Sequence, residues 1–293
     1  MVTKTLAKWE QKTPNSLANT LLVIDFDSTF LEEESLDVLA KMLLSHPENA
    51  GTLEEFLHVT ASGMEGNMSF CESLKWRIKH LDISKKHLED LIELLKNKIT
   101  PSFKRNRDFI KTYSDQIYIL SGGFKEIITP IVAEFGISEE HVFANTFIFN
   151  EDGIATGFDM TNPLAHDKGK VTCIKQLKFS KDVVMIGDGM TDYEVKELDI
   201  VKKFFAFTEN IRRDAVVRVA DCVVEDFESF LNIQGWGESA SSLKNTMGKV
   251  LLLENINPQA SIFFQERGFE VECFPGGLEE EELIKRLKGV KLL

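Results

Sequence analysis

The chain has 293 residues, 43% of them apolar and 10% aromatic, which is the composition of a globular protein that can bury a core. Its formal net charge of −13 argues against partners such as nucleic acid or an anionic membrane surface, because both attract a basic face. No stretch approaches the roughly 20 apolar residues of a membrane span, and no signal-peptide core is present, so we expect a cytoplasmic protein. The cysteines Cys71, Cys173, Cys222 and Cys273 are far apart and predict neither a zinc site nor a disulfide framework.

Short apolar runs that end on polar residues predict strands buried on both faces of a parallel sheet. These runs are residues 20–25, 116–123, 182–189, 201–207 and 221–226. Helical patterns at 124–136 and 168–179 lie between them, which predicts an α/β fold with a doubly wound, Rossmann-like parallel sheet. Residues 141–159 predict a β-excursion around a turn at 150–153.

Residues 35–100 have helical spacing throughout and predict a helical-bundle cap inserted after the first strand. The core would then consist of residues 1–34 and 101–233, with Pro101 marking the return of the chain to the sheet. Residues 234–248 are rich in glycine, serine and polar side chains and predict a linker. Residues 249–293 predict a small α/β unit of strand, helix, strand and helix, with a third strand beginning at its end.

Polar side chains gather where the predicted strands end, and open α/β sheets bind ligands at that edge. They are Asp25 and Asp27, then Ser121, Gly122 and Gly123, then Asp188 and Asp192, with Lys168 opening the helix before the last pair. Several carboxylates in one cleft repel one another unless a cation is bound, and oxygen ligands suit Mg²⁺. One carboxylate that attacks phosphorus beside another that transfers protons predicts phosphoryl transfer through an aspartyl-phosphate.

The motifs DFDST (25–29), SGG (121–123), Lys168 and GDGMTD (187–192) resemble the haloacid dehalogenase superfamily in order and spacing. DFDSTFLEEESLD (25–37) and MEGNMSFCESLKWRI (64–78) extend the resemblance to the phosphoserine phosphatase family. The resemblance implies that Asp25 is the nucleophile and Asp27 the general acid and base. It also implies that Mg²⁺ is bound by the Asp25 and Asp188 carboxylates and by the Asp27 main-chain carbonyl, with Asp192 supporting the metal shell. The phosphate would be bound by Ser121, the Gly122 backbone and Lys168.

The same resemblance implies that substrate contacts come largely from the cap. Glu34 would meet the ammonium group of the substrate and Arg77 its carboxylate, while Met64 and Phe70 would shield the site and Gly123 and Thr191 would lie beside it. Plainer interpretations stay open: Glu34 lies in an acidic run typical of a solvated face, Arg77 fits a surface helix, and Met64 and Phe70 fit an ordinary core. Many relatives carry asparagine where this chain has Thr191. The histidines are scattered, and we interpret His166 as structural.

The resemblance predicts a cytoplasmic, Mg²⁺-dependent phosphatase that releases serine and phosphate from O-phospho-L-serine, the last step of serine biosynthesis. A phosphatase for another small phosphomonoester stays open, and so does a non-catalytic protein that docks through its C-terminal segment. The intact acids and lysine disfavour the latter. The sequence leaves the oligomeric state open, a homodimer included.

The C-terminal segment carries a resemblance of its own. Residues 249–290 resemble the start of D-3-phosphoglycerate dehydrogenase, and they end before any nucleotide-binding glycine turn. They would be the stub of a fusion or a small docking module, without dehydrogenase activity.

Overall fold

The computed structural model describes residues 19–64, 67–236, 249–252, 270–273 and 290–292. The chain divides into two compact units, Met1–Trp236 and Gly237–Leu293. In the described part of the chain, no helix is both long and apolar enough to cross a membrane.

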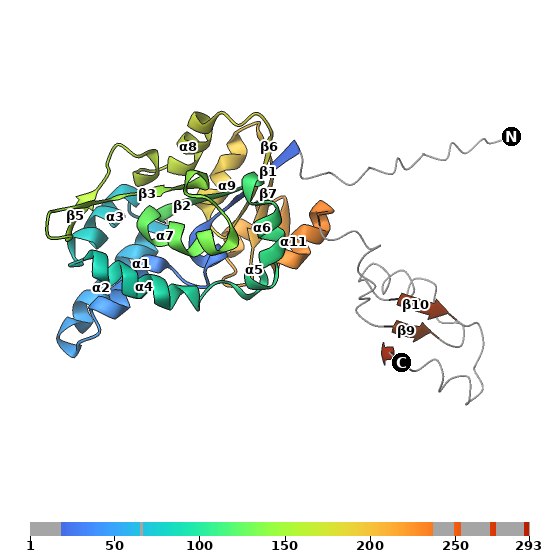
Figure 1. The fold of residues 1–293 in the computed structure, drawn as a ribbon, viewed down its shortest axis with the longest axis horizontal. Coiled ribbons are helices and arrows are strands. Elements are labelled where there is room, and N and C mark those ends of the chain that lie inside the picture. The colour runs from blue at the N-terminus through green and yellow to red at the C-terminus, as the bar shows by residue number, and fades with distance from the viewer. Residues whose placement is uncertain (1–18, 65–66, 237–248, 253–269, 274–289, 293) are drawn as a thin grey trace. The chain divides into compact units, whose positions relative to one another are not determined.

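The first unit is built on a six-stranded sheet in which every pairing is parallel (Figure 1). In spatial order the strands are β3 (Val142–Asn145), β2 (Ile117–Phe124), β1 (Thr20–Ile24), β6 (Asp182–Gly187), β7 (Val201–Phe207) and β8 (Cys222–Val224). The predicted α/β fold class and its five predicted strands are confirmed. The prediction missed β3 as a member of this sheet, because its four residues were assigned to the β-excursion that follows.

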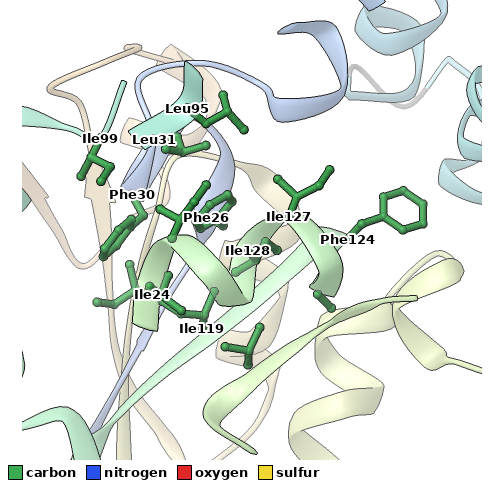
Figure 2. Close-up of a cluster of buried hydrophobic side chains, with 14 of the residues drawn as sticks. Ile24, Phe26, Phe30, Leu31, Leu95, Ile99, Ile119, Phe124, Ile127 and Ile128 are labelled. Atoms are coloured by element: carbon green, nitrogen blue, oxygen red, sulfur yellow. The ribbon is translucent and has the colours of Figure 1, made fainter. Parts of the chain in front are cut away.

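Both faces of the sheet are covered, as apolar runs without alternation predict. Leu22 and Ile24 of β1 belong to one core cluster, whereas Leu21 and Val23 belong to the other. The first cluster includes residues of α5 (Pro101–Arg105), α6 (Arg107–Thr112), α7 (Lys125–Val132) and α11 (Phe227–Gln234). The second includes residues of α8 (Gly169–Leu177) and α10 (Asp214–Val217). Figure 2 shows part of the first cluster, where Ile24 and Ile119 of neighbouring strands lie against Ile127 and Ile128 of α7.

The insert after β1 forms four helices, as predicted: α1 (Ser35–Leu43), α2 (Ala50–Met64), α3 (Phe70–Lys79) and α4 (Lys85–Lys96). Serine residues cap two of them, because the side chains of Ser69 and Ser84 accept hydrogen bonds from main-chain N–H groups of the first turns of α3 and α4. Two linkers join this cap to the core and run side by side, paired at Leu31 and Ile99. Pro101 begins α5, so two short helices, α5 and α6, precede the return to the sheet.

The predicted β-excursion is a hairpin of β4 (Phe147–Phe149) and β5 (Ala155–Phe158). Its turn is stabilised by Asn150, whose side-chain oxygen accepts from the N–H groups of Asp152 and Ile154, and by Gly153 at φ 75°. The hairpin contacts the cap, since the Ala155 N–H donates to the Ile83 carbonyl.

In the second unit the described residues form a parallel sheet in the order β10 (Glu270–Cys273), β9 (Lys249–Leu252), β11 (Val290–Leu292). The third strand expected from the sequence is therefore present. The predicted helices of this unit and most of the predicted linker lie outside the described residues.

Candidate active site

Three aspartates from two neighbouring strand ends form the centre of the site. Asp25 follows β1 and Asp188 follows β6, and the Asp25 N–H donates to the Ile186 carbonyl at 3.0 Å. Asp192 lies in α9 (Met190–Tyr193), which begins just after β6. All three side chains are buried, and each offers a carboxylate oxygen within 4.8 Å of the others. The parallel pairing of β1 with β6 thus brings together acids that are far apart in the sequence.

The structure does not place Lys168, the lysine predicted to bind phosphate, with these aspartates. The Lys168 side chain is 61% exposed, and its Nζ lies 3.3 Å from Oε2 of Glu197. Lys170 takes the expected place instead. Its buried Nζ donates to Oδ1 of Asp25 at 2.6 Å and to Oδ1 of Asp192 at 2.5 Å.

The side of α8 that contacts the sheet explains why Lys170, and not Lys168, lies beside the aspartates. Lys170, Ile174 and Leu177 are spaced by four and three residues and therefore share one side of the helix, which contacts the sheet. Lys168 precedes the helix as its N-cap residue, with φ 55° in the left-handed region, and its side chain is exposed. The spacing of Lys170 and Ile174 is visible in the sequence, but the side of the helix that contacts the sheet is not.

Burial dominates the electrostatics of the cluster. It raises the pKa of Asp25 well above its ordinary value, and the negative charge of Asp192 adds to the shift while Lys170 opposes it. Burial raises the pKa of Asp192 too. For Lys170 burial alone would lower the pKa, but Asp192 and Asp25 outweigh it and raise the pKa. The Lys170 ammonium is therefore charged at neutral pH.

Two further side chains hold Asp188, and the sequence interpretation assigned a role to neither. The Thr29 hydroxyl donates to Oδ1 of Asp188 at 3.1 Å, and Nε of Arg213 donates to Oδ2 at 2.8 Å. Thr29 lies inside the DFDST motif, so its position was a usable signal. Arg213 comes from the loop after β7, where no motif marked it.

Asp27 lies beside the glycine loop that ends β2. Its Oδ1 accepts from the Ser35 N–H at 2.7 Å. A Cβ atom placed on Gly123 would lie 3.0 Å from Oδ2 of Asp27 and 3.1 Å from Oγ of Ser121, so glycine at this position lets the three groups lie together. Burial raises the pKa of Asp27 to about 6, although the hydrogen bonds from Ser35 oppose the shift. Asn145, a further unpredicted residue, supports the loop by donating to the Gly122 carbonyl at 2.8 Å.

Glu34 and Arg77 approach the same region from the cap side. Glu34 is half-buried and accepts a hydrogen bond from the Ser28 hydroxyl at 2.7 Å. Removal from water, followed by the charge of Asp27, raises the pKa of Glu34 to about 8. Arg77 is buried, which lowers its pKa, while the charges of Asp37, Glu34 and Asp27 oppose that shift. Among the described residues, Nε of Arg77 has no hydrogen-bond partner.

Phe70 covers the glycine loop from the cap. A Cβ atom on Gly122 would lie 2.7 Å from the Phe70 ring, so the ring rests directly on this backbone. The Phe70 N–H donates to Oδ1 of Asp167 at 2.7 Å, which ties the start of α3 to the core. Thr191 is exposed on α9. Met64 ends α2, and its side chain lies outside the described residues.

Residues 22–196 match the family of haloacid dehalogenase-like hydrolases. The chain belongs to this family. It is 31% identical to the phosphoserine phosphatase of Drosophila melanogaster over 215 residues, which cover 72% of this chain and 76% of the relative. It is also 31% identical to the human phosphoserine phosphatase over 210 residues, covering 71% of this chain and 89% of the relative.

Solved structures agree with the assignment of this chain to the haloacid dehalogenase-like hydrolases. A phosphoserine phosphohydrolase-like protein from Francisella tularensis superposes with a TM-score of 0.65 at 28% identity, covering 73% of this chain and 99% of that protein. A structure described as a phospho-aspartyl intermediate analogue of phosphoserine phosphatase superposes with a TM-score of 0.59 at 23% identity, covering 73% and 98%. The latter shows the shared fold. The protein is therefore an enzyme, a phosphatase of the haloacid dehalogenase type.

The aspartate cluster of the hydrolase fits a divalent cation. Three buried carboxylates lie with two cationic side chains, Lys170 on Asp25 and Asp192 and Arg213 on Asp188, so negative charge remains that a bound cation would neutralise. The donors are all oxygen atoms, which suits a hard cation. A Cβ atom on Gly187 would lie 2.4 Å from Cγ of Asp192, so this glycine leaves the space that the third carboxylate needs.

Proposed function

We propose that this phosphatase hydrolyses O-phospho-L-serine to serine and phosphate through an aspartyl-phosphate on Asp25, with Mg²⁺ as cofactor, as the last step of serine biosynthesis. In this proposal residues 1–34 and 101–233 form the catalytic core and residues 35–100 its cap. The names of the relatives support the choice of substrate, and the charged side chains of Glu34 and Arg77 support it from this chain's own residues.

The observation that carries the proposal is the pair formed by Glu34 and Arg77. Both lie near Asp27, and Arg77 is buried with an Nε that no described residue accepts from. A buried guanidinium of this kind favours a carboxylate ligand, which it can bind in bidentate fashion. A neighbouring carboxylate favours an ammonium group. A phosphomonoester that carries both groups is a phosphorylated amino acid.

In the first step a carboxylate oxygen of Asp25 attacks phosphorus, and the bond between phosphorus and the serine oxygen breaks. Asp27 donates its proton to the departing oxygen. Its pKa of about 6 suits this work near neutral pH, because a group that gives and takes protons acts best when its pKa is close to the working pH. Lys170, which contacts Asp25, offers its ammonium group to the phosphate oxygens, and Ser121 and the N–H groups of the glycine loop, which lie beside Asp27, also donate to them.

In the second step Asp27, now ionised, takes a proton from a water molecule whose oxygen attacks the phosphorus of the acyl phosphate. The bond to Asp25 breaks, and the original carboxylate returns with release of phosphate. Asp25 and Asp188, with the main-chain carbonyl of Asp27, would hold Mg²⁺, and Asp192 would support them. When bound, this ion neutralises the carboxylates and the charge on the phosphate. Phe70, resting on Gly122, limits the access of water during the first step.

The test is phosphate release from phosphoserine, phosphothreonine and small esters without an amino-acid group, each measured with Mg²⁺ and after chelation. We expect phosphoserine to be preferred and chelation to stop turnover. Arg77→Met should lower kcat/KM for phosphoserine about 100-fold, because a charge-assisted bidentate contact contributes about 3 kcal/mol. Esters without a carboxylate should lose little. Equal rates across the panel, unaffected by Arg77→Met, would leave a general phosphatase and remove phosphoserine as the substrate.

A further inference from the structure

One side chain from the loop after β7, that of Asn210, contacts two segments that are far apart in the sequence, residues 28–31 and Thr100. Nδ2 of Asn210 lies 3.0 Å from the Leu31 carbonyl and 2.7 Å from the Thr100 hydroxyl. It also lies 3.2 Å from the carbonyls of Ser28 and Thr29. The first two acceptors belong to the two cap linkers, and the last two belong to the loop that follows the nucleophile Asp25. A carboxamide has two N–H donors, so these acceptors share them.

The two linkers are themselves joined where Asn210 binds them. Leu31 and Ile99 form an antiparallel bridge and lie side by side in Figure 2. The Thr100 N–H donates to the Phe30 carbonyl at 3.0 Å, and the Thr100 hydroxyl donates to the Thr29 carbonyl at 2.7 Å. Thr100 is fully buried. The start and the end of the cap are thus held as one unit at the base of the nucleophile loop.

The nucleophile loop needs such support because its backbone is strained. Ser28 has φ 56°, in the left-handed region that a residue with a Cβ atom seldom adopts. The Ser28 hydroxyl holds Glu34, and the Ser28 carbonyl faces Asn210. Glu209, the neighbour of Asn210, extends the contact by accepting from the Ser102 N–H at 3.1 Å, at the start of α5 beyond the second linker.

We propose that Asn210 is a positioning residue that clamps both cap linkers to the nucleophile loop and so sets how Glu34, which follows the first linker, and Arg77 of the cap are presented to the phosphate site. The role proposed for Asn210 rests on the proposed function only in the kinetic part of the test, in which phosphoserine is the substrate. A side chain that merely stabilised the core would affect every ligand of the site alike. A clamp on the cap affects the part of the substrate that the cap recognises.

The test compares Asn210→Leu with Thr100→Val, the double variant and a control, Asn106→Leu. Leucine keeps the branched shape of asparagine but has no hydrogen-bond donors, and the same change at Asn106 controls for its larger volume. Asn106 is the matched control because it is also half-buried, but its Nδ2 donates to a carbonyl of its own helical segment, that of Ser102 at 2.9 Å. Hydrogen–deuterium exchange of peptides covering residues 28–34 and 96–100 reports on the linkers without any substrate. Kinetics then give KM for phosphoserine and the inhibition constant of inorganic phosphate, whose proposed ligands Lys170, Ser121 and the Gly122 backbone all belong to the core.

For Asn210→Leu we expect faster exchange in both linkers, a KM for phosphoserine raised about tenfold, and a phosphate inhibition constant changed less than about twofold. The double variant should add little to Asn210→Leu, because Thr100 and Asn210 belong to one network. Unchanged exchange in the linkers would overturn the clamp, and so would a parallel rise of KM and of the phosphate inhibition constant. If the wild type fails to hydrolyse phosphoserine, the proposed substrate falls, and exchange together with the phosphate constant still decides the clamp.

Discussion

Replacing Lys170 by methionine, with Lys168→Met as the matched control, separates two lysines that the sequence motif does not distinguish. Methionine keeps the straight, apolar part of the side chain and removes the charge. The Lys170 side chain is 9% exposed and contacts Asp25 and Asp192. The Lys168 side chain is 61% exposed and forms an ion pair with Glu197.

The expected magnitudes follow from that difference in burial. Removing one partner of a buried ion pair costs about 3–5 kcal/mol of folding free energy. One of the two carboxylates left behind can take up a proton, because burial already raises the pKa of Asp25 and Asp192, so we expect about 3 kcal/mol. For a domain of this size that corresponds to a fall in Tm of about 6–12 °C. Exposed pairs such as Lys168 with Glu197 contribute less than about 1 kcal/mol, so Lys168→Met should melt within about 4 °C of the wild type.

Catalysis should separate the lysines further. A preorganised cation that contacts the nucleophile and the phosphate is expected to contribute about 100-fold to 1,000-fold in kcat, which Lys170→Met would lose. Phosphate release from phosphoserine and thermal melting, each with and without Mg²⁺, measure both effects. Added Mg²⁺ should restore part of the Tm of Lys170→Met, since the cation neutralises the same carboxylates. Wild-type kcat in Lys170→Met together with a large loss in Lys168→Met would refute the assignment.

Three other changes test the remaining parts of the site. Asp25→Asn should abolish turnover while the far-ultraviolet circular dichroism spectrum stays that of the wild type, because an amide cannot attack phosphorus. The folded-state pKa of Glu34, about 8, lies above its ordinary 4.5, so its contribution to stability is complete below about pH 4.5 and is lost as pH rises through about 8. Glu34→Gln should therefore gain in Tm over the wild type as pH rises from about 5 to about 8. Asp167→Ala should raise KM about threefold and speed exchange at the start of α3, whereas Asp167→Asn keeps the acceptor for the Phe70 N–H and should not.

Each of these changes has an outcome that contradicts its reasoning. Residual turnover in Asp25→Asn would exclude an aspartyl-phosphate on that residue. A Tm difference between Glu34→Gln and the wild type that stays constant from pH 5 to pH 8 would show that Glu34 does not titrate as the burial of its carboxylate implies. Equal KM values for Asp167→Ala and Asp167→Asn would show that the contact with Phe70 does not hold the cap.

The sequence by itself determined the alternation of buried strands and helices, because both rest on local periodicity. The runs around Val23 and Met185 are apolar on both sides and could only be buried in a covered sheet, and acids at the ends of those runs had to meet at one edge of it. Asp25, Asp27 and Asp188 were predictable for that reason. The short strand β3 was not, since four residues beside a hairpin carry too little pattern to separate the two.

Only the tertiary structure decided which lysine lies beside the buried aspartates and which residues support them. The lysine motif does not state which side of α8 contacts the sheet, and the packing of Ile174 and Leu177 turns Lys170 inward and leaves Lys168 in water. Arg213 and Asn210 lie in a loop without a motif, and they reach Asp188 and the cap linkers because β7 ends beside β6. Contacts between segments so far apart in the sequence depend on which strands are neighbours, and local periodicity carries no information about that order.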